Sequence, residues 1–135
     1  PIWASIGVVD VGTHTVVGEI QLDAEDVNDL HLSQDGTRLF VNTTTSLVEL
    51  DVTRNLVIRS LDVAEATVGL GITPDGLFAY IGSLEPLIFQ PVLAVVDITE
   101  WQVLGRVRGF IFPQDIVFRR TSFSSEETEA ALLLP

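Results

Sequence analysis

The sequence contains no cysteine and no lysine, and each absence narrows the chemistry open to the protein. Without cysteine there is no disulfide framework, no thiolate metal site and no thiol nucleophile. The seven basic residues are all arginines and stand against 19 acidic residues, which leaves a net charge of -12. Because a charge of this sign repels phosphate backbones, we expect no nucleic-acid partner.

Long apolar runs and catalytic motifs are missing as well. The longest apolar stretches, residues 91–96 and 130–134, fall far short of the ~20 residues that a membrane helix needs, so we expect no membrane span. No basic-then-apolar leader opens the chain. Neither a G-x-S-x-G nor an H-E-x-x-H motif occurs, and residues 69–71 lack the third glycine of a dinucleotide fingerprint. The sequence therefore names no catalytic residue and no cofactor.

What the sequence does contain is an internal repeat. An aspartate that ends an apolar run recurs at Asp10, Asp51 and Asp97, at spacings of 41 and 46 residues. Between these positions, the Asp-Gly pairs at 35–36 and 75–76 lie 40 residues apart, and each precedes another apolar run. Two interleaved patterns with a common period indicate tandem structural units.

Each unit is interpreted as four short β-strands. Runs of Val, Ile, Leu and Phe are separated by turn residues, which is the pattern of strands and hairpins. We expect the Asp-Gly pairs to form hairpin turns in which Gly36 and Gly76 supply a positive φ. We expect Asp10, Asp51 and Asp97 to cap backbone N–H groups at strand ends, because catalytic residues are rarely repeated in every unit.

The order of these elements resembles the YVTN-type (WD40-like) β-propeller repeat. The motif that names this family stands at residues 39–43 as Leu-Phe-Val-Asn-Thr and, more weakly, at 79–82 as Ala-Tyr-Ile-Gly. The turn motif stands at 33–36 as Ser-Gln-Asp-Gly and at 73–76 as Thr-Pro-Asp-Gly. The resemblance covers residues 6 to about 118 and implies an all-β fold of four-stranded propeller blades. It implies no particular activity, since such propellers host many unrelated functions.

On this resemblance the chain is a partial β-propeller of about 2.5–3 four-stranded blades of ~40 residues. The repeats cover residues 1–119, and 120–135 form a C-terminal tail. The tail is left open between strand and helix, because Ser124 and Glu127 resemble a capping box. The implied strands are residues 5–11, 15–22, 27–33, 38–42, 46–52, 56–62, 68–73, 77–82, 92–98, 102–108 and 114–119.

An incomplete ring leaves apolar blade faces without a cover, since known propellers close with roughly four to eight blades. Three arrangements stay open. The chain is a piece of a longer polypeptide with further blades, or it assembles with copies of itself, or its repeats form a smaller open stack. In the second arrangement, residues 114–119 and 130–134 complete the N-terminal half-blade. We favour the first two and expect an oligomer or further blades, with Trp3 and Trp101 filling gaps between blades.

Loops gather on the two faces of a propeller and commonly carry its function. The insertion at residues 84–91 places Leu87, Ile88 and Phe89 between two prolines and accounts for the longer second spacing. We predict that these three residues, with Asn42 and Thr44 on the same face, bind a partner, such as another protein. Packing of the insertion onto the adjacent blade is the alternative.

A short acidic loop is the one weak metal candidate. Asp23, Glu25 and Asp26 offer oxygen ligands of the kind that calcium prefers, but they lack the spacing and central glycine of a calcium loop. A solvated acidic loop is the simpler interpretation. His14 and His31 fall in different repeats, which disfavours a two-histidine metal site.

Taken together, these features favour a binding or scaffold module, extracellular or periplasmic, that acts through loop surfaces and blade faces. Two alternatives stay open. The chain contributes blades to a lactonase-like or amine-dehydrogenase-like propeller enzyme, although no catalytic constellation supports this. Or it is a structural surface-layer component, which its acidity and unclosed ring suit.

Overall fold

The computed structural model describes residues 3–24, 26–85, 87, 90–109, 115–120 and 128–133. Over these residues the chain forms twelve β-strands and no helix, so the expected all-β class is confirmed. None of them belongs to a helix long and apolar enough to span a membrane.

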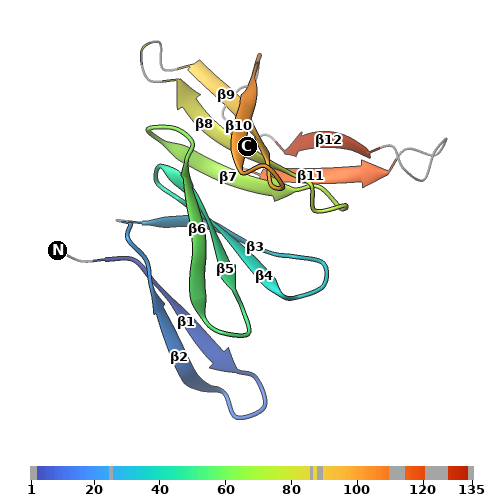
Figure 1. Ribbon diagram of the computed structural model, residues 1–135. Helices are drawn as coiled ribbons and strands as arrows, with labels where there is room; N and C mark the ends of the chain where they lie inside the picture. Colours follow the sequence, from blue (N-terminus) through green and yellow to red (C-terminus); the bar gives the residue numbers. More distant parts are fainter. Residues whose placement is uncertain are drawn as a thin grey trace.

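Four antiparallel sheets follow one another along the chain (Figure 1). Sheet I consists of β1 (Ser5–Asp10) and β2 (Thr15–Gln21). Sheet II consists of β3 (Val27–Leu32), β4 (Arg38–Thr43), β5 (Ser46–Asp51) and β6 (Leu56–Asp62). Sheet III consists of β7 (Thr67–Ile72), β8 (Phe78–Glu85), β9 (Gln90–Asp97) and β10 (Gln102–Arg108). Sheet IV consists of β11 (Asp115–Arg120) and β12 (Thr128–Leu133). Within each sheet, strands that are consecutive in sequence are neighbours.

Within the described residues, the strands expected from the sequence are confirmed, with one difference of extent and one added strand. The β8–β9 hairpin is longer than expected, because Leu84 pairs with Pro91 and Glu85 pairs with Gln90. The insertion in the second repeat therefore lengthens a hairpin, which Figure 1 shows projecting at the top of the molecule. The second difference is in the tail, where residues 128–133 form a strand paired with β11, so the helical option is wrong there.

The two Asp-Gly turns have the expected conformation. Gly36 and Gly76 both adopt a φ of 74°, in the left-handed region where a side chain would be strained. Asp35 Oδ1 accepts hydrogen bonds from the Thr37 backbone N–H and the Ser33 hydroxyl, and these bonds lower the pKa of Asp35 to about 2. Equivalent bonds from Thr73 and Leu77 lower the pKa of Asp75. The same two hydrogen bonds to an aspartate thus close both hairpins.

The recurrent aspartates cap backbone N–H groups, as expected. The Asp10 carboxylate accepts from Gly12 and Thr13, Asp51 from Thr53 and Arg54, and Asp97 from Glu100. Four residues after each aspartate the chain turns through the left-handed region, at residues His14, Asn55 and Trp101. The repeat therefore preserves a turn and not a reactive group.

Two apolar clusters join the sheets face to face. The first lies between sheets I and II and contains Ile20, Val41 and Leu50. The second is larger and lies between sheets II and III, with Phe40 on one side and Ile81 on the other among its buried members. Burial of these side chains is the main source of stability for the stack.

Sheet IV packs onto sheet III through a position that tolerates no side chain. A Cβ at Gly71 of β7 would lie 2.6 Å from Ile116 Cγ2 and 3.0 Å from Phe118 Cε2. Phe118 also meets Tyr80 of β8 edge to face, with ring centroids 5.4 Å apart. The glycine thus allows β11 to approach β7 closely.

Candidate binding groove

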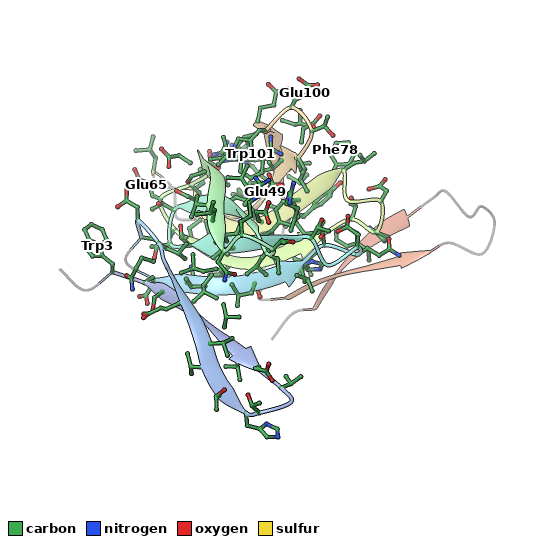
Figure 2. The ribbon with its side chains drawn as sticks, turned by 60° about the horizontal axis from the view of Figure 1, so that its bottom comes forward. Trp3, Glu49, Glu65, Phe78, Glu100 and Trp101 are labelled. Carbon is green, nitrogen blue, oxygen red and sulfur yellow. The ribbon has the colours of Figure 1, made fainter. Side chains whose placement is uncertain are left out.

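The junction of sheets II and III is held together by a buried acid and its arginine partners. Glu49 on β5 forms ion pairs with Arg59 Nε at 2.5 Å and with Arg38 Nε at 3.5 Å. The Arg59 guanidinium lies 4.1 Å above the centre of the Trp101 ring and donates to the Ile98 carbonyl oxygen at 2.8 Å. Figure 2 labels Glu49 and Trp101, the two side chains that Arg59 contacts. Arg59 therefore links the outer strand of sheet II to the last turn of sheet III.

Further hydrogen bonds cross the same junction near its inner strands. The Asn28 side-chain amide donates to the Thr67 carbonyl oxygen at 2.8 Å, and Asp29 Oδ2 accepts from the Leu70 backbone N–H at 3.0 Å. Because each bond joins β3 to β7, the two sheets are held in one register. Trp101 packs in the gap between the sheets as expected, whereas Trp3 is half exposed and its place between blades stays a prediction.

A groove of about 820 Å³ opens between sheets II and III at the end of the molecule where β6 and β10 finish. Its size is within the range of ligand sites in proteins. The lining carries side chains of both charges: Asp62, Glu65, Glu85, Arg106 and Arg108, with Thr45, Val63 and Ala64 completing the wall. Figure 2 shows Glu65 at the margin of the molecule, exposed to solvent.

Two arginines from β10 define one side of the groove. Arg106 donates to the Val63 carbonyl oxygen at 2.6 Å and ties β10 to the loop after β6. Arg108 binds both carboxylate oxygens of Glu85, at 2.9 and 2.7 Å. This hydrogen-bonded pair lowers the pKa of Glu85 and raises that of Arg108, so both groups stay charged. Of the three acidic residues in the groove, Asp62 and Glu85 form hydrogen bonds with other side chains. The side chain of Glu65 forms no hydrogen bond or ion pair with another described residue.

Glu85, which lines this groove, belongs to the insertion of the second repeat. Leu87 lies two residues beyond Glu85, and 93% of its surface is exposed. Ile88 and Phe89, predicted with it to bind a partner, lie outside the described residues. The groove thus has an apolar neighbour at the tip of the β8–β9 hairpin.

The other two residues predicted to bind a partner lie differently. Asn42 is fully buried, and its side-chain amide has no hydrogen-bond partner among the described residues. Its place two positions after Phe40 puts it on the face toward sheet III, so it offers no surface to a partner. Thr44 is half buried, and its carbonyl oxygen accepts from the Thr67 backbone N–H.

A second groove, of about 600 Å³, lies between the two Asp-Gly turns. Its lining combines the apolar side chains of Phe40, Ile72 and Ile98 with charged ones: Asp35, Arg38, Glu49 and Asp75. The carboxylates of Asp35 and Asp75 are engaged in their own turns. These two aspartates of the second groove therefore already have hydrogen-bond partners.

The weak calcium candidates do not come together into a site that the structure describes. Asp23 and Asp26 are exposed, and Glu25 lies outside the described residues. Among the residues with described positions, no group of three or more acidic or histidine side chains is placed to hold a metal ion. His14 lies in the β1–β2 turn and His31 on β3, where His31 lines the second groove.

The charged residues of the groove were not among those predicted to bind a partner. Glu65, Arg106 and Arg108 come from segments that are far apart in the sequence. A signal did exist for the ion pair at the junction of sheets II and III, where Glu49 and Arg59 each interrupt an otherwise apolar strand. A charge at such a position indicates a buried ion pair or a site.

Comparison with known proteins places the fold and not the function. No protein-family model and no curated protein matches the sequence. The structure is similar to Kuenenia stuttgartiensis hydrazine synthase, with a TM-score of 0.72 and 19% identity over 95% of this chain and 43% of that one. It is also similar to a functionally unknown protein from Desulfotomaculum acetoxidans, with a TM-score of 0.71 and 16% identity over 84% of this chain and 36% of that one. The chain therefore spans less than half the length of these two proteins and shares an all-β fold with them.

Proposed function

We propose that the four sheets are parts of a β-propeller: two complete blades, sheets II and III, flanked by two half-blades. Sheet I corresponds to the outer two strands of a blade, because its Asp10 turn matches the turns after Asp51 and Asp97. Sheet IV corresponds to the inner two strands, because Ile116 pairs with Leu132 as Leu70 pairs with Ile81. This assignment agrees with the YVTN-type resemblance of the sequence.

We infer that the protein is a binding module, extracellular or periplasmic, whose working surface is the groove between sheets II and III. The observation that carries this is the groove itself, which is lined by side chains of both charges where two repeats meet. Loops on a rigid sheet scaffold are a common place for recognition. Exchange of loop residues changes such a surface without changing the stack beneath it.

The chemistry of the groove fits a polypeptide partner. A peptide is neutral along its backbone and presents both N–H donors and carbonyl acceptors, which match the carboxylates and guanidinium groups of the lining. A polyanion would be repelled by the net charge of -12. The exposed Leu87 adds an apolar contact beside the polar groove, as binding surfaces commonly require.

A peptide-selection experiment tests this function. Peptides are selected from a random library on the immobilised chain, and their affinity is measured by fluorescence anisotropy for two charge-reversal variants. We expect Glu65→Lys to weaken binding by about tenfold, because it reverses a free charge in the groove. Glu100→Lys is the matched control: it makes the same exchange at an exposed residue in the turn between β9 and β10, which does not line the groove. Equal effects of the two variants, or failure to select any peptide, would contradict the proposal.

A second candidate function follows from the likeness to hydrazine synthase. The chain would then supply blades to an enzyme whose reactive groups lie elsewhere. This candidate predicts that no mutation in the described grooves abolishes turnover. The binding module is preferred because the groove is the feature that this chain itself displays.

A further inference from the structure

The apolar positions of the repeat are buried or exposed according to which end of the stack they face. Leu70 on β7 is 3% exposed and Ile116 on β11 is 6% exposed. Leu30 holds the same repeat position on β3 and is 47% exposed. In the outer strands, Leu50 is fully buried, while its counterpart Val9 on β1 is 55% exposed. The exposed positions thus carry the same kind of apolar side chain as the positions that a neighbouring sheet covers.

The two ends of the stack lack different parts of a neighbouring sheet. Leu30 and Leu32 lie on the inner strand of sheet II, on the side facing sheet I, and the cluster between the two sheets includes Val27 of β3 but not these two leucines. What is missing there is an inner pair of strands, of the kind that sheet IV represents. At the other end, Val107 on β10 is exposed, while its counterparts Ile20 and Leu61 pack against the next sheet. What is missing there is an outer pair, of the kind that sheet I represents.

The chain therefore carries, at its opposite ends, the two pieces that its own surfaces lack. Each piece also has a free edge. Within the described residues, β1 pairs with β2 alone and β12 pairs with β11 alone. Unpaired edges of this kind readily accept a strand from another chain. Together, sheet IV and sheet I have the strands of one complete four-stranded sheet.

We propose that two copies of this chain join head to tail, with sheet IV of each copy completing sheet I of the other. This rests on the propeller arrangement proposed above. Each copy then contributes the equivalent of three blades, so two copies give about six and three copies about nine, against the roughly four to eight of known propellers. Among assemblies of this kind, the pair is the one that closes. It has a two-fold axis, the commonest symmetry of protein assemblies.

The repeat also specifies the register of the new strand pair. In sheet II, Leu39 pairs with Leu50, and in sheet III, Ala79 pairs with Val96. The counterpart of Leu39 and Ala79 on β12 is Ala130, which pairs with Phe118 on β11. The counterpart of Leu50 and Val96 on β1 is Val9. Ala130 of one copy therefore lies opposite Val9 of the other.

Cysteine cross-linking tests both the partner and the register, because the chain has no cysteine of its own. Under mild oxidation, the double variant Val9→Cys with Ala130→Cys is expected to form disulfides between chains, giving a species of twice 14.7 kDa on a non-reducing gel. The control, Val9→Cys with Ala131→Cys, moves one thiol by a single residue. It should cross-link poorly, because neighbouring residues of a strand point to opposite faces.

Light scattering of the unmodified chain gives an independent measurement that does not depend on the cysteine variants folding. We expect a mass of twice 14.7 kDa, lowered toward the monomer by Leu30→Glu and unaffected by Leu56→Glu, an equally drastic change at an exposed leucine of β6 outside the proposed contact. A monomer, a ladder of higher species or equal cross-linking of both cysteine pairs would overturn the closed pair. A monomer would leave further repeats of a longer polypeptide as the cover. A monomer that still binds the selected peptides would separate failure of this inference from failure of the proposed function.

Discussion

The junction between sheets II and III and the two open ends of the stack present the same repeat positions in opposite circumstances. At the junction, Leu70 and Ile72 are buried beneath sheet II, and Arg59 crosses from one sheet to the other. At the open end, Leu30 and Leu32 occupy the equivalent positions and are about half exposed. The difference teaches that burial here is decided by the neighbouring sheet, because the side chains themselves are alike.

The largest effect that this comparison predicts is the loss of stability when a buried apolar side chain is shortened. Leu70→Ala should lower the free energy of unfolding by about 2–5 kcal/mol, because it removes buried methyl groups and leaves a cavity. Leu30→Ala is the matched control and should cost about 0.5 kcal/mol or less in chains diluted below association. Both values come from urea denaturation. Equal losses in the dilute chains would show that Leu30 has a cover within a single copy, and the comparison would break.

A smaller effect is expected from the charged contacts. Glu49→Gln should cost about 1–3 kcal/mol, because Glu49 is buried while its arginine partners would keep a charge without its counterpart. Glu85→Gln makes the same exchange in the exposed pair with Arg108 and should leave the melting temperature within experimental error. If Glu85→Gln lowers the melting temperature as much as Glu49→Gln, then burial does not decide how much each ion pair contributes to stability.

The smallest effect on stability is expected at the Asp-Gly turn. Sheets II and III both have this turn, and it does not depend on a neighbouring sheet. The pKa of Asp35 in the folded chain is about 2, below its ordinary value of 3.8, so its hydrogen bonds stabilise the fold fully above pH 3.8. That contribution is lost as the pH falls from 3.8 toward 2. Asp35→Asn should therefore lower the melting temperature at neutral pH and reduce its dependence on pH in the acid range. Asp23→Asn, at an exposed residue outside the turns, should change neither.

The strand pattern could be predicted because its causes are local. Alternating apolar runs, the Asp-Gly turns and the capping aspartates depend on residues within a few positions of each other, and they gave the strand positions to within a few residues for β1 to β7. The tail was harder. The segment 128–133 is short, and no turn motif stands beside it in the sequence. Its strand β12 was therefore recognised only from its pairing with β11.

The candidate groove could not be predicted in the same way. Asn42 belongs to the motif that suggested the repeat, but its side chain turns toward sheet III and is buried. Arg106 reaches the Val63 carbonyl oxygen across 43 positions of sequence, and Arg59 reaches Ile98 across 39. Such contacts depend on how two sheets stack, and no local pattern encodes the stacking distance or angle.

By itself, the sequence determined the all-β class, the repeat and the turns, because steric preference and strand alternation act between near neighbours. Tertiary structure alone decided which apolar positions are covered, which charges meet and where a groove opens. The physical reason is that burial and ion pairing belong to pairs of surfaces, and a surface acquires its neighbour only when the sheets come together.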